Sequence, residues 1–334
     1  PDGTRMSESE SDASHLDHAR LASHWELNNV THCPEIEIHG SPTRVLGRCV
    51  VKAGKDNDLY LFEQVAPKNR KRKVEIAALL ASLSENGLRR VDPYLPTSDG
   101  QWHACVDGDF WQLRRYTPGV ELPRPSYIYD RWRGRVAADA LLSLRRALGR
   151  VQPETSEPVF SVWAFAHEFI ERLRPHRPEF VAEIEDILTF VKERYVPYEA
   201  DLTTGYCHGD FHPMNVVWGE DDILRLIDWE FCGPKPELYD VALMAGCFAM
   251  ENPEGLTGGA FKEFVGTLRR QHFGTEHSWS LFLEFTVAIR LAWLKEWVRY
   301  DRRKMIELEV VLMRLLINDT RLNRHFLPPD RGEG

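Results

Sequence analysis

Alternation between apolar and polar positions organises the first third of the chain. A period of two runs through residues 35–39, and two apolar runs follow at 45–51 and 59–65, with turn-forming residues between them. Successive side chains of a strand point to opposite faces, so this pattern predicts an antiparallel meander of three strands. A further strand pair is predicted at 102–106 and 110–116, across the turn Asp107-Gly108-Asp109.

Helical periodicity appears in two places before the middle of the chain and dominates the rest. A short helix is predicted near 21–27, and a longer one after Pro67 that closes at Asn86-Gly87. Beyond Thr117-Pro118-Gly119 the pattern predicts helices at 129–149, 159–173, 178–195, 236–250, 259–272, 278–300 and 303–318. The predicted fold class is α+β, with a five-stranded antiparallel sheet followed by a larger, mainly helical part.

Length and local composition suggest two lobes and a tail. A chain of 334 residues usually divides into two compact units. Residues 1–18 are polar and acidic and are expected to be a disordered tail. We expect an N-terminal nucleotide-binding lobe at 19–116, a hinge at 117–119 and a C-terminal catalytic and substrate lobe at 120–334.

Composition narrows the class of protein. A hydrophobic fraction of 43% and a charged fraction of 28% are typical of globular proteins, and a net charge of -9 argues against nucleic acid as a partner. No apolar run approaches the roughly 20 residues of a bilayer span, so we expect no membrane partner and a cytoplasmic location. The six cysteines form no Cys-x-x-Cys pair, which argues against a zinc or redox site.

The segment His208-Gly209-Asp210-Phe211-His212-Pro213-Met214-Asn215 carries the strongest chemical signal. It is followed by apolar runs at 216–218 and 223–227, which are separated by a turn and predict a hairpin. Antiparallel pairing would bring Asn215 close to Asp228, so that two oxygen ligands converge on one point. Mg²⁺ prefers such hard oxygen ligands, and Asp210 on the preceding loop can meet a substrate hydroxyl.

This motif, with Ile227-Asp228-Trp229-Glu230 and Tyr239-Asp240-Val241-Ala242 after it, resembles the aminoglycoside phosphotransferase, choline kinase and homoserine kinase-like superfamily. The resemblance implies a bilobal, protein-kinase-like fold and the use of ATP with Mg²⁺. It implies Asp210 as the catalytic base and Asn215 and Asp228 as metal ligands. It further implies that His208 shapes the loop and that Asp240 is a structural carboxylate.

On the nucleotide side, the resemblance implies a hinge at 111–119 in which backbone groups of Arg115 and Thr117 bond the adenine. It places a phosphate-covering turn at 40–44, with Ser41 and Arg44 as candidates, although a plain hairpin turn explains that segment equally well.

Many relatives place a phosphate-gripping Lys on the third strand, where this chain has Glu63 within Tyr60-Leu61-Phe62-Glu63. Homoserine kinase-like sequences share the Leu-Phe-Glu segment that this chain has at residues 61–63. Lys52 on the neighbouring strand is the best substitute cation and Arg44 the next. Glu75 on the following helix is the expected partner of such a cation, or alternatively an ordinary exposed helix residue.

The acceptor is expected against the C-terminal helices. Aromatic residues with interspersed carboxylates could hold a cation, whereas an Arg among aromatics could hold a carboxylate. Simple core filling is the alternative for most of them. The candidates for acceptor binding are Glu230, Arg290, Trp293 and Trp297.

The function predicted from these features is ATP- and Mg²⁺-dependent phosphorylation of a hydroxyl on a small molecule such as an amino alcohol, amino acid, sugar or aminoglycoside. The alternative is a catalytically impaired, kinase-like regulatory protein that binds nucleotide. Protein kinase activity is disfavoured, because the segment between Asp228 and the next predicted helix is very short. The sequence leaves open the identity of the acceptor, the choice of ATP over GTP and the oligomeric state.

Overall fold

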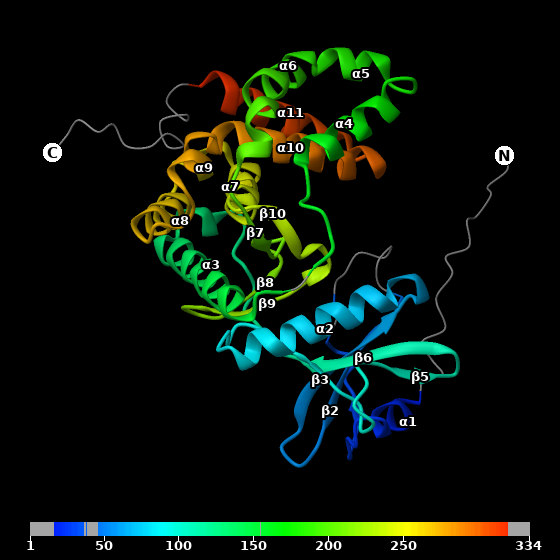
Figure 1. The fold of residues 1–334 in the computed structure, drawn as a ribbon. Helices are drawn as coiled ribbons and strands as arrows, with labels where there is room; N and C mark the ends of the chain where they lie inside the picture. Colours follow the sequence, from blue (N-terminus) through cyan, green and yellow to red (C-terminus); the bar gives the residue numbers. More distant parts are fainter. Residues whose placement is uncertain (1–16, 37, 39–45, 154, 320–334) are drawn as a thin grey trace, which may run out of the picture. The chain divides into compact units, whose positions relative to one another are not determined.

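The computed structural model of the protein describes residues 17–36, 38, 46–153 and 155–319, which form two compact units (Figure 1). The first unit contains the residues up to Glu85 together with Asp92–Thr117. The second contains Asn86–Val91 and the chain from Pro118 onward. No helix in the described part of the chain is both long enough and apolar enough to cross a bilayer.

An antiparallel sheet of six strands forms the centre of the first unit, where five strands were predicted. Strands β1 to β3, β6 and β4 lie in the order β1-β2-β3-β6-β4, and β5 also pairs with β6. The additional strand β4 is only two residues long. The strands are β1 (Thr31–His32), β2 (Arg48–Ala53), β3 (Asp58–Val65), β4 (Tyr94–Leu95), β5 (Ala104–Val106) and β6 (Asp109–Arg115).

The first predicted strand is misplaced. The structure puts β1 four residues earlier than the predicted 35–39, and the described residues there form a turn in which the Ile36 N–H donates to the Cys33 carbonyl (3.1 Å). Pro34 explains the difference, because it has no N–H to continue the ladder beyond Cys33. The predicted phosphate-covering turn at 40–44, with Ser41 and Arg44, lies outside the described residues.

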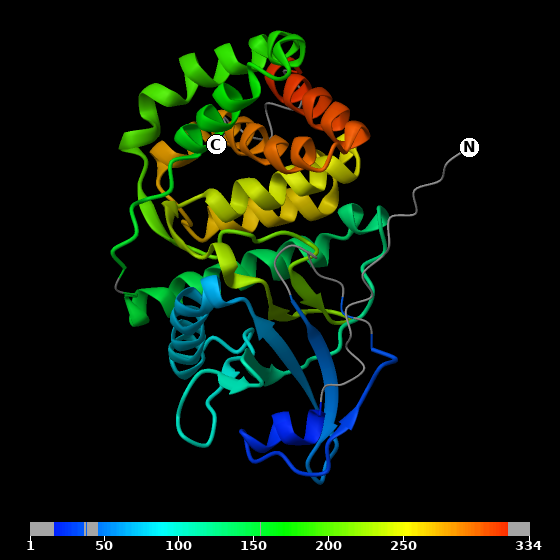
Figure 2. The same cartoon turned by 90° about the vertical axis from the view of Figure 1, so that its right-hand side faces the viewer.

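Two helices flank the sheet of the first unit (Figure 2). Helix α1 (His18–Ser23) packs Leu21 and Ala22 on the face that carries Phe62 and Leu113. Helix α2 (Arg70–Glu85) lies against the opposite face, where the Gln112 side chain donates to the Lys73 carbonyl (3.4 Å). Leu61 and Glu63 are the neighbours of Phe62 along β3. Their side chains therefore point to the opposite face, on which α2 lies.

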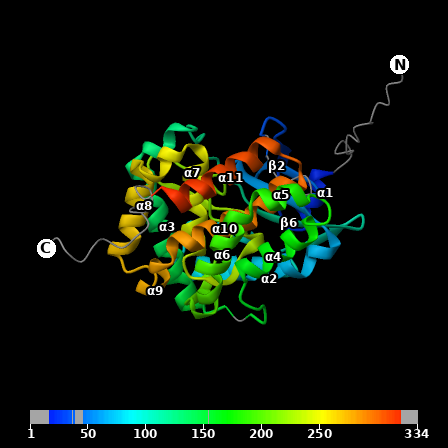
Figure 3. The same ribbon diagram turned by 90° about the horizontal axis from the view of Figure 1, so that it is seen from above.

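The second unit is mainly helical, as predicted, with α10 at its centre in contact with α4, α6, α7 and α11 (Figure 3). Helices α3 and α8 pack closely, since a Cβ on Gly134 would overlap the Ala260 carbonyl. Two predicted helices are each divided, at Ile184 and Leu281, whose side chains are buried. The helices are α3 (Arg131–Val151), α4 (Val162–Leu173), α5 (Pro178–Glu183), α6 (Glu185–Arg194), α7 (Tyr239–Glu251), α8 (Gly259–Arg270), α9 (Glu276–Ser280), α10 (Phe282–Arg299) and α11 (Arg303–Asn318).

Two small antiparallel sheets complete the second unit. The predicted hairpin is present as β8 (Val216–Trp218) and β9 (Ile223–Leu226), with Val216 opposite Leu226. A second pair joins β7 (Thr204–Cys207) to β10 (Gly233–Pro236) and was not predicted.

The segment Asn86–Val91 belongs to the second unit because it is bonded to the hairpin. The Leu226 N–H donates to the Arg90 carbonyl (2.7 Å), and the Arg90 guanidinium pairs with Asp222 (2.9 Å).

The antiparallel sheet of the first unit and the helices of the second confirm the predicted α+β fold class.

Candidate active site

The loop between β7 and β8 holds Asp210 in a buried position, with 4% of the residue exposed. Gly209 makes the bend before it, with φ at +82°, and a Cβ on this residue would overlap the Phe231 carbonyl oxygen. Only glycine adopts this conformation without strain and fits this space. The local sequence therefore fixes the backbone that carries Asp210.

Asp240, near the start of α7, fixes the backbone of the same loop. Its Oδ2 accepts the His208 N–H and its Oδ1 accepts the Gly209 N–H, each at 2.8 Å. Burial raises the pKa of Asp240 to about 6, although the two N–H donors and Lys235 act in the opposite direction. Asp240 thus holds two successive backbone N–H groups of the loop that carries Asp210.

Asn215 is oriented by Asp210. The Asn215 Nδ2 donates to the Asp210 carbonyl oxygen (3.0 Å) and to Asp210 Oδ2 (2.8 Å), which uses both amide hydrogens. The amide oxygen is therefore the atom left to serve as a ligand.

Asp228 follows directly on the hairpin. The Ile227 N–H donates to the Asn215 carbonyl (3.0 Å), so the pairing of β8 and β9 continues to the residue before Asp228. Asp228 is half-buried and has a left-handed backbone, with φ at 65° and ψ at 63°. A non-glycine residue in this region is uncommon, although Asp tolerates it better than most. The structure thus brings Asp210 and Asn215 into contact and places Asp228 beside Asn215 along the hairpin.

Two histidines of the loop are neutral at pH 7. His208 is buried, its Nδ1 accepts the Asp210 N–H (3.2 Å), and burial together with His212 lowers its pKa to about 3. Burial and Arg290 lower the pKa of His212 to about 4, and its Nε2 lies 3.6 Å from Asp210 Oδ1. The His208 hydrogen bond thus lies within the loop, and neither imidazole carries a charge that would neutralise Asp210.

The acceptor candidates fall into two groups. Arg290 and Glu309 form a fully buried ion pair between α10 and α11, and the Trp297 indole N–H donates to the same carboxylate (2.9 Å). Arg290 and Trp297 are thus both engaged by Glu309, and their role in acceptor binding stays a prediction. Three other aromatic residues of this region fill the core, which was the alternative to acceptor binding: Trp279, Phe282 and Phe285 are buried.

Trp293 remains near the catalytic loop. Its ring lies edge-on to His212, with centroids 6.1 Å apart, and it bonds Tyr239, whose phenol is in turn influenced by the charge of Asp210. Glu230 is half-buried in the turn Trp229–Phe231 that follows Asp228. Tyr239 was missed as a site residue, although it stands next to Asp240 in the quoted motif.

In the first unit, the unexpected Glu63 is buried among cations. Its carboxylate lies 2.9 Å from the Arg48 Nε and 3.4 Å from the Arg114 Nε, and it accepts the Tyr94 hydroxyl (2.6 Å). Burial by itself would raise the pKa of Glu63, but Arg114, Lys73 and Arg48 hold it below its ordinary value. Glu63 is therefore a charged residue whose charge is compensated within its own unit.

The remaining nucleotide candidates lie at the surface or in local contacts. Lys52 is 3.9 Å from Glu35, and both side chains are largely exposed. Glu75 is exposed and pairs with Lys71 and Arg72 of its own helix, at 3.9 Å and 3.8 Å.

The predicted hinge residues occupy the end of β6 and the residues after it. Arg115 pairs with Asp58 (3.1 Å), and the Thr117 hydroxyl donates to Asp92 (2.8 Å). The Tyr116 N–H donates to the Leu59 carbonyl of β3. Backbone groups alternate in direction along a strand, so those of Arg115 face away from β3.

Comparisons with solved structures relate the whole fold to small-molecule kinases. An aminoglycoside phosphotransferase from Alicyclobacillus acidocaldarius is 14% identical, with a TM-score of 0.55 over 93% of this chain and 96% of that one. A microcompartment-associated aminopropanol kinase is 15% identical, with a TM-score of 0.58 over 93% and 98%. A spectinomycin phosphotransferase in complex with ADP and spectinomycin is 11% identical, with a TM-score of 0.58 over 89% and 96%.

Sequence comparisons define the family. A protein of Deinococcus radiodurans described as uncharacterized is 25% identical over 175 residues, which are 50% of this chain and 48% of that protein. The matched region thus spans about half the length of this curated relative. Residues 50–273 match the model of the phosphotransferase enzyme family, and this region contains both the Glu63 strand and the complete Asp210 loop. With most of its length covered by that match, the chain belongs to the phosphotransferase enzyme family.

Proposed function

We propose that this protein is an ATP- and Mg²⁺-dependent kinase that transfers a phosphoryl group to a hydroxyl of a small molecule. The observation that carries the proposal is the pair of hydrogen bonds from Asn215 to Asp210, which hold the base beside a metal-ligand candidate. Asp210 accepts the proton of the attacking hydroxyl, and the lowered pKa values of His208 and His212 make both imidazoles weak bases.

Asn215 and Asp228 fit a magnesium ion. Both offer hard oxygen atoms, and the engagement of the Asn215 amide nitrogen with Asp210 directs the amide oxygen to the ion. When bound, Mg²⁺ offsets the negative charge of the nucleotide phosphates. The ADP in the related spectinomycin phosphotransferase supports an adenine nucleotide as the donor.

On the nucleotide side, we assign the phosphate-facing cations to Arg48 and Arg114 in place of Lys52. Both arginines are oriented by Glu63, and their side chains remain 17% and 16% exposed, so an anion can reach them. The backbone of Arg115, turned away from β3, and that of Thr117 are assigned to the adenine.

The acceptor we favour carries an amine as well as a hydroxyl. Arg290, the candidate partner of an acceptor carboxylate, is occupied by Glu309, whereas Trp293 and Tyr239 present aromatic rings near Asp210. Aromatic faces and carboxylates attract cations. Two of the related structures are named for aminoglycoside and aminopropanol substrates, and both compounds combine these groups.

A coupled assay of ADP release tests the proposal, with a panel of amino alcohols, aminoglycosides, sugars and hydroxy amino acids. We expect release above the acceptor-free rate with at least one amine-bearing alcohol, and none when Mg²⁺ is chelated. Release that depends on no acceptor in the panel, or that persists without a divalent metal, would contradict it.

A further inference from the structure

A cavity of about 480 Å³ lies in the second unit, between the C-terminal half of α3 and the strands β7 and β10. Its volume is within the range of small-molecule sites. Asp210, Asn215 and Asp228 are not among the described residues that line it, so it is separate from the candidate active site. Its wall is mostly apolar and includes Leu141, Leu144, Leu148, Pro234 and Phe273.

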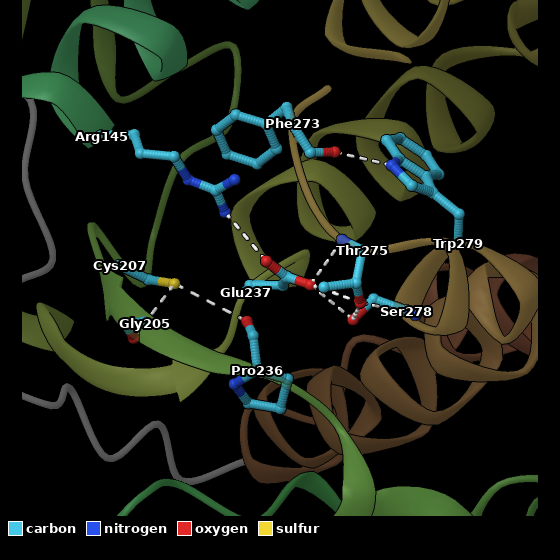
Figure 4. Close-up of polar contacts among 9 residues, drawn as sticks. All are labelled: Arg145, Gly205, Cys207, Pro236, Glu237, Phe273, Thr275, Ser278 and Trp279. Atoms are coloured by element: carbon cyan, nitrogen blue, oxygen red, sulfur yellow. Dashed lines mark hydrogen bonds and ion pairs between the residues drawn. The ribbon is translucent and has the colours of Figure 1, made fainter. Parts of the chain in front are cut away.

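Three ionisable carboxylate or guanidinium groups line the cavity, and the two carboxylates are already satisfied. Glu237 Oε1 accepts the Thr275 N–H (2.8 Å), the Thr275 hydroxyl (2.9 Å) and the Ser278 hydroxyl (2.7 Å) (Figure 4). Asp240 is taken up by the two N–H groups of the catalytic loop. Neither carboxylate needs a cationic ligand.

Arg145 is different, because most of its donors have no acceptor in the described part of the chain. Its guanidinium lies over the Phe273 ring, 3.5 Å from the centroid, and makes one long contact of 3.4 Å with Glu237 Oε2 (Figure 4). An arginine has five N–H donors in a planar fork, so one such contact leaves most of them for another partner. The Arg145 side chain is 39% exposed, whereas that of Glu237 is 7% exposed.

The pKa of Arg145 agrees with this shortage of acceptors for its N–H donors. Burial lowers the pKa of Arg145 despite the opposing effect of Glu237, whereas Arg114 and Arg290 have raised pKa values because their carboxylate partners outweigh burial. Among these three arginines, Arg145 is therefore the one for which carboxylate partners do not outweigh the cost of burying the charge.

We infer that this cavity is a second binding site, for a small organic monoanion whose carboxylate pairs with Arg145 and whose compact apolar body lies between the α3 leucines, Pro234 and Phe273. A carboxylate matches the guanidinium fork with two parallel hydrogen bonds. A dianion such as a phosphate monoester fits less well, since Glu237 and Asp240 lie in the same wall and would repel the second charge.

The position of the site connects it to the catalytic loop. Cys207, which directly precedes His208, and Asp240, which holds the loop backbone, both line the cavity. A ligand in this cavity therefore touches Asp240, which holds the loop, and the residue from which the loop starts.

Isothermal titration of the full chain with benzoate, cyclohexanecarboxylate and the uncharged analogue benzamide tests the inference. We expect one carboxylate per chain and binding of benzamide weaker by about tenfold or more, the loss typical of a charge-assisted bond. Arg145→Gln should remove this preference. Arg146→Gln, which removes the same charge from the exposed neighbouring position of α3, should leave binding unchanged.

A second variant keeps the test independent of the Arg145 substitution. Gly149 lines the cavity, and a Cβ built on it meets no atom within 4 Å, so Gly149→Leu should fold normally while adding a bulky side chain at the cavity wall. We expect it to weaken carboxylate binding about tenfold, in line with the loss of apolar contact. Undetectable binding at millimolar carboxylate, equal binding of benzamide, or binding that survives Gly149→Leu would overturn the inference. None of these results depends on phosphotransferase activity.

Discussion

At the scale of single residues, the environment of Glu63 bears on how the proposed site holds the nucleotide phosphates. A carboxylate at this strand position would be expected to repel a triphosphate. The structure shows it between Arg48 and Arg114 and bonded to Tyr94. The charge of Glu63 is compensated inside the unit. In the proposed site, the two arginines that it orients provide the positive charge for the phosphates.

The stability contribution of Glu63 should depend on pH. Its folded pKa lies below the ordinary 4.5, so its contribution is complete above that pH and is lost as the pH falls through the folded value. We expect Glu63→Gln to lower the free energy of unfolding at pH 7 by about 3 kcal/mol, because it leaves the half-buried Arg48 and Arg114 without their counter-charge. Urea denaturation should show this difference constant from pH 7 to 5 and shrinking below 4.5. A difference that grows in acid would contradict the assignment.

The role of Arg48 can be separated from that of Lys52 by binding measurements. Arg48→Gln should weaken ATP about tenfold and leave adenosine binding unchanged, since a charge-assisted phosphate contact is lost. Lys52→Gln serves as the matched control, because it removes one positive charge from the same strand at a surface position. The assignment fails if the Lys52 variant, and not the Arg48 variant, loses affinity for ATP.

At the scale of elements, the catalytic loop depends on its glycine. Gly209→Ala introduces both a strained backbone and an overlap with the Phe231 carbonyl, so we expect a loss of about 3 kcal/mol or more in unfolding free energy. Gly149→Ala in α3 meets open space and should be neutral or stabilising, by up to about 1 kcal/mol. Equal stability of the two variants in chemical denaturation would show that the loop is not held as described.

The elements also show what the sequence could and could not predict. The hairpin at Val216–Leu226 was predictable because two apolar runs flank a turn. The β7 and β10 pair was not, because Pro234 and Pro236 are typical of loops. The ion pair of Arg290 with Glu309 was not predictable either, because Glu309 lies on another helix and only tertiary packing brings the two together.

At the scale of the whole molecule, the fold joins a six-stranded sheet unit to a helical unit, and the proposed function requires nucleotide binding by the folded chain. A ligand that binds only the folded state raises the melting temperature. We expect ATP to raise it more with Mg²⁺ than with EDTA, and Asn215→Ala to reduce the difference. Stabilisation by ATP that ignores Mg²⁺ would favour the alternative of a regulatory nucleotide-binding module.

The proposed role of Asp210 as the base of a phosphoryl transfer can be measured by single-turnover transfer from ATP to an identified acceptor. Asp210→Asn preserves the size of the side chain while removing the proton acceptor. We expect a transfer rate lower by about a hundredfold or more, with ATP affinity and melting temperature close to those of the unmodified protein. An unchanged transfer rate in the folded variant would show that Asp210 is not the base.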